Sequence, residues 1–248
     1  MIPLKDDNAT RNTPIITYAI LGVCVVVFLL QISSKGFSDG TLFYSYGVIP
    51  ASLLGTINLP TELEKVPPYI TILTSMFMHG GWMHLIGNML YLWIFADNIE
   101  DDLGKTKFIL FYLLSGAAAA LTQVYMDVAS EIPMVGASGA IGGVLGAYLI
   151  RYPREKVLVL IPLGIFSQII RIPALFVLGF WFILQFISSA MSSGQGGGVA
   201  YGAHIGGFVF GAAAMIVLSK FFKTSNAYVR KTEPQEVKKN NKNNPWAQ

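Results

Sequence analysis

Long apolar stretches without a charged side chain alternate along the chain with short polar segments. A helix needs about 20 predominantly apolar residues to cross the hydrocarbon of a bilayer. Stretches of this kind cover residues 12–34, 66–96, 108–126, 132–150 and 172–219. The last stretch is too long for one helix and is divided by the glycine-rich residues 192–198. The pattern therefore predicts six transmembrane helices.

Each predicted helix occupies only part of its stretch. We expect helices near residues 19–32, 84–96, 108–126, 138–150, 173–190 and 201–222. Segment 157–170 is also apolar, but it is short and carries Pro162 and Gly164 in its middle. Its length favours an interfacial or re-entrant segment over a further span.

The placement of the basic residues supports this topology. If the N-terminus is cytoplasmic, only Lys35 and Lys65 of the 17 Lys and Arg residues face outward. Cytoplasmic segments of membrane proteins carry such an excess of positive charge. The sequence therefore predicts an all-α membrane protein, a six-helix bundle with both termini cytoplasmic. It would comprise a cytoplasmic N-terminal segment, a membrane domain and a disordered cytoplasmic tail, at residues 1–12, 13–223 and 224–248.

The composition narrows the classes of function and partner. Of all residues, 53% are hydrophobic and 12% are charged, whereas soluble domains carry about 25% charged residues. A lipid bilayer is therefore an expected partner, and nucleic acid is not, because no basic run with interleaved aromatic residues precedes the tail. The single cysteine, Cys24, excludes an internal disulfide and a cysteine metal cage. Compactness and the lack of a targeting segment favour the plasma (inner) membrane of a prokaryote.

Three polar side chains are expected at a similar depth in the membrane. The second, fourth and sixth helices run in the same direction, and His84, Ser138 and His204 each lie near the start of one of them. Polar and ionisable groups inside a membrane are costly and are usually functional. A serine that opens a helix also has free backbone N–H groups beside it, which could stabilise a developing oxyanion.

Two glycine-lined faces are predicted to bring the serine helix and the histidine helix together. Glycines lie four and eight residues after Ser138, and three and seven residues after His204. Small residues let membrane helices approach closely. A serine becomes a good nucleophile when an adjacent base takes its proton. The alternatives are a small-residue packing surface around Ser138 and a structural, hydrogen-bonded His204.

His84 and Asn88 are four residues apart and share a helix face. Their N–H groups are suitable donors to an oxyanion, although an interhelical hydrogen-bonded pair is the alternative. No predicted span contains a carboxylate. A Ser-His dyad is therefore expected in place of a triad, and a buried metal site is disfavoured.

Three motifs combine these residues. They are His-Gly-Gly-Trp-Met-His-Leu-Ile-Gly-Asn from His79, Gly-Ala-Ser-Gly from Gly136, and Ala-His-Ile-Gly-Gly from Ala203. In order and in placement on the second, fourth and sixth helices, they resemble the rhomboid family of intramembrane serine proteases. The resemblance extends from residue 14 to residue 222.

The resemblance implies a role for each catalytic candidate. Ser138 would be the nucleophile, and His204 would be the general base and then the general acid. His84, Asn88 and the backbone N–H of Ser138 would form the oxyanion hole. The chemistry would need no cofactor and no metal.

The resemblance also implies supporting residues and a class of substrate. His79 would support the outer loop, and Gly136 would shape the turn before the serine. The substrates would be transmembrane helices of other proteins, cut near their outer ends. The fifth helix would be the mobile side that admits them, and residues 194–198 would belong to a loop that caps the site.

Two positions depart from the family pattern. Some members carry a tyrosine four residues after the nucleophile, stacked on the catalytic histidine; here that residue is Gly142, so another group must hold His204. The Trp-Arg pair that some members carry in the first outer loop is also missing. The competing interpretations are a catalytically silent rhomboid-like binder or chaperone, and a transporter or channel, although no internal repeat is visible.

Overall fold

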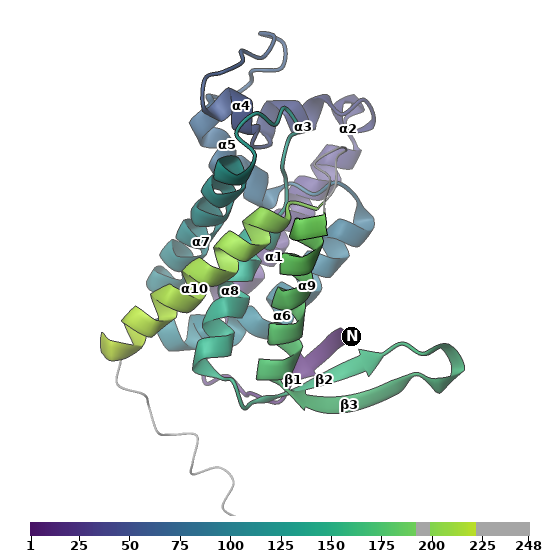
Figure 1. Cartoon of the computed structure of the whole chain (residues 1–248), viewed down its shortest axis with the longest axis vertical. Helices are drawn as coiled ribbons and strands as arrows, with labels where there is room; N and C mark the ends of the chain where they lie inside the picture. Colours follow the sequence, from purple (N-terminus) through teal and green to yellow (C-terminus); the bar gives the residue numbers. More distant parts are fainter. Residues whose placement is uncertain (192–198, 222–248) are drawn as a thin grey trace, which may run out of the picture.

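The computed structural model describes residues 1–191 and 199–221, and most of them are helical (Figure 1). The long helices are α1 (Ile15–Ile32), α6 (Trp82–Leu103), α7 (Lys105–Met126), α8 (Ser138–Arg151), α9 (Ala174–Met191) and α10 (Tyr201–Phe221). Of these, α1, α7, α9 and α10 are long and apolar enough to cross a membrane. The predicted tail and the glycine-rich segment 192–198 lie outside the described residues.

Short helices gather at one end of the bundle (Figure 1). They are α2 (Lys35–Ser38), α3 (Thr41–Tyr46), α4 (Pro50–Leu53), η1 (Pro68–Ile70), α5 (Thr71–Thr74) and η2 (Ser75–Phe77). Val48 and Met134 exchange backbone hydrogen bonds of 2.9 and 2.8 Å. Since Met134 lies just before α8, this bridge anchors the loop that leads to Ser138.

Helix α8 is short and lies at the centre of the bundle. It has 14 residues, and residues 139–148 are all buried. At 1.5 Å per residue it is about 21 Å long, shorter than the hydrocarbon of a bilayer. It begins at Ser138, as the sequence predicted. Because the preceding Ala137 is fully buried, the helix begins inside the protein and not at its surface.

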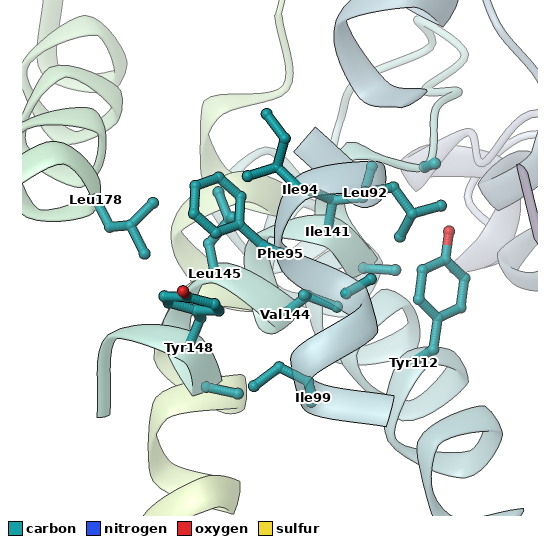
Figure 2. Close-up of a cluster of buried hydrophobic side chains, with 14 of the residues drawn as sticks. Leu92, Ile94, Phe95, Ile99, Tyr112, Ile141, Val144, Leu145, Tyr148 and Leu178 are labelled. Atoms are coloured by element: carbon teal, nitrogen blue, oxygen red, sulfur yellow. The ribbon is translucent and has the colours of Figure 1, made fainter. Parts of the chain in front are cut away.

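Side chains of all six long helices form the hydrophobic core, and Figure 2 shows the part around α8 that α6, α7, α8 and α9 supply. The core includes Leu92, Phe95 and Ile99 of α6, Tyr112 of α7, Val144, Leu145 and Tyr148 of α8, and Leu178 of α9. Helices α8 and α10 are in backbone contact. A Cβ on Gly207 or Gly211 would collide with the carbonyl oxygen of Gly139 or Gly143, respectively. The glycine-lined approach predicted for these helices is therefore confirmed.

A three-stranded antiparallel sheet extends sideways from the other end of the bundle (Figure 1). Its order is β1 (Ile2–Asp6), β2 (Lys156–Ile161) and β3 (Gln168–Pro173), with η3 (Gly164–Phe166) between the last two. Segment 157–170 is thus a hairpin and not a membrane helix.

The prediction of an all-α fold did not include this sheet. Strand β1 contains Pro3 and Lys5 within five residues and shows little apolar alternation. Proline is tolerated in β1 because it is an edge strand, and the register shifts by a bulge between Pro3 and Lys5. The partner strand is also about 150 residues away, so no local pattern indicates the pairing.

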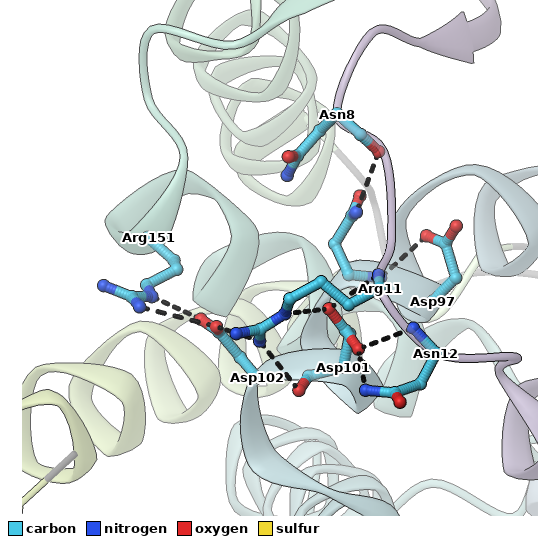
Figure 3. Close-up of polar contacts among 8 residues, drawn as sticks. Asn8, Arg11, Asn12, Asp97, Asp101, Asp102 and Arg151 are labelled. Atoms are coloured by element: carbon cyan, nitrogen blue, oxygen red, sulfur yellow. Dashed lines mark hydrogen bonds and ion pairs between the residues drawn. The ribbon is translucent and has the colours of Figure 1, made fainter. Parts of the chain in front are cut away.

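Acidic residues at the end of α6 hold the N-terminal segment against the bundle (Figure 3). The carboxylate of Asp101 accepts the backbone N–H groups of Arg11 and Asn12, each at 3.1 Å. The guanidinium of Arg11 also contacts Asp101 at 2.9 Å. Asp102 forms an ion pair with Arg151 at the end of α8. These contacts fix the relative positions of the N-terminal segment, α6 and α8.

Two further buried carboxyl groups also join the N-terminal part of the chain to α6 and α8. Glu100 accepts the backbone N–H groups of Ile16 and Thr17 at 3.0 and 2.7 Å. It thereby caps the first turn of α1, which has no capping side chain of its own. Tyr148 donates its hydroxyl to Asp6 at 2.6 Å. Burial raises the pKa of Asp6 to about 6, and the nearby Asp7 and Glu155 carboxylates act in the same direction.

Candidate active site

A cavity of about 670 Å³ opens among α6, α7, α8, α9 and α10 and the loop before α8. All the predicted site residues except His79 line it. These are His84, Asn88, Gly136, Ser138 and His204. Residues from helices that are distant in the sequence therefore meet around one space.

Ser138 is the first residue of α8 and is half-buried at the cavity wall. The preceding turn is shaped by Gly136, whose φ of +132° favours glycine. The backbone N–H of Gly136 donates to the carbonyl of Ser75 at 2.9 Å, which fixes the turn. Because the first N–H groups of a helix lack intrahelical partners, this end of α8 can bind an oxyanion.

His84 faces the same turn from the first part of α6. Its Nδ1 accepts the backbone N–H of Gly80 at 3.2 Å, so the ring proton of the neutral imidazole lies on Nε2. A Cβ built on Gly136 would lie 2.7 Å from this Nε2 and 3.5 Å from Oγ of Ser138. The donor of His84 and the hydroxyl of Ser138 therefore flank Gly136.

Asn88 lies one turn after His84 on α6, on the same side of the helix. The residue is 8% exposed, and its Nδ2 has no hydrogen-bond partner among the described residues. A buried amide donor without a partner costs free energy. At the wall of a cavity, such a donor is available to a ligand.

His204 lies on α10 and is held by two side chains of α9. Its Nδ1 is 2.7 Å from Oε1 of Gln185. The Trp181 ring lies 5.7 Å from the imidazole, at an interplanar angle of 32°. The group that holds His204 in the absence of a tyrosine at position 142 thus comes from a different helix.

The backbones beside Ser138 and His204 touch each other. A Cβ built on Gly139 would lie 3.8 Å from the carbonyl oxygen of Ala203. A Cβ on Gly142 would lie 2.9 Å from the carbonyl oxygen of His204. The close approach of α8 and α10 thus brings the start of α8 beside the start of α10 and leaves little room for a side chain at position 142.

His79 lies behind His84 and is fully buried. The two rings meet edge to face, with 5.2 Å between centroids. The backbone of His79 exchanges two hydrogen bonds with the amide of Gln31, of 3.1 and 3.2 Å. This clamp joins the end of α1 to the loop before α6. A supporting role for His79 stays a prediction.

Sequence reasoning missed Gln31, Gln123 and Gln185. Gln123 accepts the backbone N–H of Ala203 at 3.2 Å, which positions the start of α10 against α7. All three are uncharged amides inside apolar stretches. Polar groups at such places usually have a partner or a function, and this signal could have identified them.

The Rhomboid domain family model matches residues 67–221, which include α6 to α10. The relatives of this chain include three proteins that are similar over most of it. Rhomboid protease GluP of Bacillus subtilis is 31% identical over 83% of this chain and 36% of its own length. Rhomboid protein 1, mitochondrial, of Saccharomyces cerevisiae is 28% identical over 83% of this chain and 54% of its own length. Rhomboid protease GlpG of Haemophilus influenzae is 25% identical over 85% of this chain and 94% of its own length.

The relatives differ in length and in compartment. The chain spans about half or less of the yeast and Bacillus proteins. Bacterial, mitochondrial and chloroplastic proteins all occur among the relatives, so the similarity does not favour the prokaryotic membrane expected from the sequence. The family match covers more than half of the chain and coincides with helices long and apolar enough to cross a membrane. We conclude that this integral membrane protein belongs to the rhomboid family.

Proposed function

We propose that the protein is an intramembrane serine endopeptidase that cleaves transmembrane segments of other membrane proteins with a Ser138–His204 dyad. The supporting observation is that both residues line one cavity together with His84 and Asn88. The relatives named as rhomboid proteases support a hydrolase at the level of the family.

The first half of the reaction forms an acyl-enzyme. Oγ of Ser138 attacks the scissile carbonyl carbon while Nε2 of His204 takes the hydroxyl proton. The carbonyl oxygen becomes an oxyanion, which accepts hydrogen bonds from Nε2–H of His84, Nδ2–H of Asn88 and the backbone N–H of Ser138. As the intermediate collapses, the C–N bond breaks and His204 returns its proton to the leaving amine.

The second half repeats these steps with water. His204 takes a proton from a water molecule, which attacks the ester carbonyl of the acyl-enzyme. The same donors hold the second oxyanion. Collapse breaks the ester bond, and His204 protonates Oγ of Ser138, which restores the enzyme. Water has to reach the site, and a cavity that polar side chains line in part and that protein surrounds makes this possible at membrane depth.

The proposal includes a six-span topology with both termini cytoplasmic. Helices α6 and α8 would add two spans to the four that length and hydropathy identify. Lys65 would then face outward and Glu155 inward. In a Cys24→Ser background expressed in cells, an impermeant maleimide should label Lys65→Cys and not Glu155→Cys. Equal labelling of both would contradict the topology.

The decisive experiment is cleavage of a reporter transmembrane helix by the purified protein in detergent. Wild type should cut the reporter and react with a fluorophosphonate probe, whereas Ser138→Ala and His204→Ala should do neither. The matched control is Ser115→Ala, because Ser115 is a buried serine of α7 that does not line the cavity. It should retain cleavage.

Each result has a separate meaning. Equal cleavage by wild type and Ser138→Ala would show that Ser138 is not the nucleophile. The wild-type protein could instead bind several helix-weakened reporters without cutting them and without reacting with the probe. This result would favour a catalytically silent rhomboid-like binder.

A further inference from the structure

We propose that Gln185 of α9 is a positioning residue that fixes the tautomer and the ring plane of His204. The inference rests on the proposed function, because it assigns His204 the role of general base. It goes beyond that function by making the orientation of the base depend on a helix that carries neither dyad residue.

The short contact between the two side chains sets the location of the ring proton. Oε1 of Gln185 lies 2.7 Å from Nδ1 of His204, a distance typical of a strong hydrogen bond. A carbonyl oxygen only accepts, so Nδ1 must carry the proton of the neutral imidazole. Nε2 is then unprotonated and can take the proton of a serine hydroxyl. The carboxylate of a triad has the same orienting effect.

Two residues of α9 restrain the ring in two directions. Trp181 lies one turn before Gln185 on α9 and its ring partly faces the imidazole, while the amide holds the ring edge. Trp181 is itself stacked on Phe208 of α10, with 6.1 Å between centroids. These contacts therefore replace the support that position 142 cannot give.

Few other groups could orient or charge the imidazole. The titratable residues that line the cavity with His204 are His84, Tyr91 and Asp127. The ring of Tyr201 stands edge-on, 6.4 Å from the imidazole. Among the described residues, Gln185 is the hydrogen-bond partner of the His204 ring, so loss of its amide should free the ring to change tautomer.

The first test separates orientation from packing by kinetics. Gln185→Leu removes the acceptor and keeps a similar volume; it should lower kcat by about 10- to 100-fold, since a positioned base contributes about 10²- to 10⁴-fold. KM should change little. Gln185→Glu keeps an acceptor, so it should retain most of kcat. In the pH profile of the Gln185→Glu variant, the fall of kcat/KM on the acidic side should occur at a higher pH than in wild type, because the carboxylate stabilises the imidazolium. The control is Leu184→Ala, an exposed neighbour on α9, which should behave as wild type.

The second test does not depend on cleavage. The chain has three histidines, so ¹⁵N-histidine NMR of the Ser138→Ala protein in micelles can be assigned by substituting His79 and His84 in turn. His204 should show the Nδ1–H tautomer, and Gln185→Leu should convert it to a mixture. An Nε2–H tautomer with Gln185 present, or an unchanged spectrum in Gln185→Leu, would overturn the inference.

The two tests distinguish failure of the inference from failure of the proposed function. If the wild-type protein cuts no reporter but shows the expected tautomer, the Gln185–His204 contact is supported and the protease assignment fails. If the wild-type protein cuts the reporter and Gln185→Leu changes only KM or thermal stability, the protease assignment stands and Gln185 is a packing residue. If Gln185→Leu does not fold, the pH profile and spectrum of Gln185→Glu decide.

Discussion

A Cβ atom on Gly136 would lie 2.7 Å from Nε2 of His84, closer than a carbon and a nitrogen can approach. The Gly136 φ of +132° is also unfavourable for any other residue. The position therefore keeps the His84 donor and the start of α8 in direct contact. This relationship makes Gly136 a sensitive point of the candidate oxyanion hole.

Gly136→Ala should therefore impair both stability and the site. Backbone strain of this kind costs about 1–3 kcal/mol, and a displacement of about 1 Å can slow catalysis by about 10²-fold. Thermal unfolding in detergent and the rate of fluorophosphonate labelling measure the two effects. Gly22→Ala is the control, because a Cβ at this position in α1 meets nothing within 4 Å. A labelling rate like that of wild type would contradict the prediction.

Asn88→Ala should lower kcat by about 10²-fold, as for the loss of one oxyanion donor. The unfolding temperature should change little, because Nδ2 of Asn88 has no partner among the described residues. Asn98→Ala is the matched variant on the same helix. Its amide donates to the carbonyl of Asn8 at 3.0 Å, so this substitution should destabilise the fold and leave kcat unchanged. If Asn88→Ala lowered the unfolding temperature and left kcat unchanged, Asn88 would not be a donor of the oxyanion hole.

Gly211→Ala should destabilise the bundle by forcing α8 and α10 apart. The new methyl group would collide with the carbonyl oxygen of Gly143, and overpacking of this kind typically costs about 1–3 kcal/mol. Gly179→Ala on α9 is the control, since its Cβ would meet nothing within 4 Å. The free energies of unfolding of the two variants provide the comparison, and equal values would argue against the close helix contact.

The contact between Asp6 and Tyr148 should make stability depend on pH. The pKa of Asp6 is raised from 3.8 to about 6 in the folded protein. The folded state therefore binds the proton more tightly than the unfolded state does. The resulting stabilisation should be complete below pH about 4 and should be lost as the pH rises through 6.

Asp6→Asn tests this dependence because it keeps an acceptor for the Tyr148 hydroxyl and cannot titrate. The decline in unfolding free energy between pH 4 and 7 should be smaller in this variant than in wild type. Asp39→Asn is the control. Hydrogen bonds from Thr41 lower the pKa of Asp39, so its effect on the unfolding free energy falls below pH 4. An unchanged slope in Asp6→Asn would show that Asp6 titrates normally.

The sequence predicted the helices of the site because their signals are local. Ser138 lies two residues after Gly136, near the start of an apolar stretch, and glycines recur at helical spacing after Ser138 and His204. Both features depend only on nearby residues, so the start of α8 and its contact with α10 could be anticipated. That these residues carry the reaction remains a prediction.

The contact between Gln185 and His204 was not predictable in the same way. It depends on the rotation of α9 about its own axis, which the packing of Trp181 and Phe182 against Phe208 determines. Periodicity cannot fix this angle, since the exposed side of α9 is as apolar as the side that faces the bundle. The tautomer of His84 similarly depends on one backbone N–H, that of Gly80.

Strand β1 implies that the order of synthesis differs from the order of assembly. Its partner, β2, begins at Lys156, after α1, α6, α7 and α8 have already been made. At about 5–20 residues per second, a ribosome needs about 8–30 s to cover this distance. During that time β1 has no strand to pair with, although it is the first element of the chain. A chaperone or a fused partner that binds β1 would therefore compete with closure of the sheet, and β1 would reach its final place only after four of the long helices have been made.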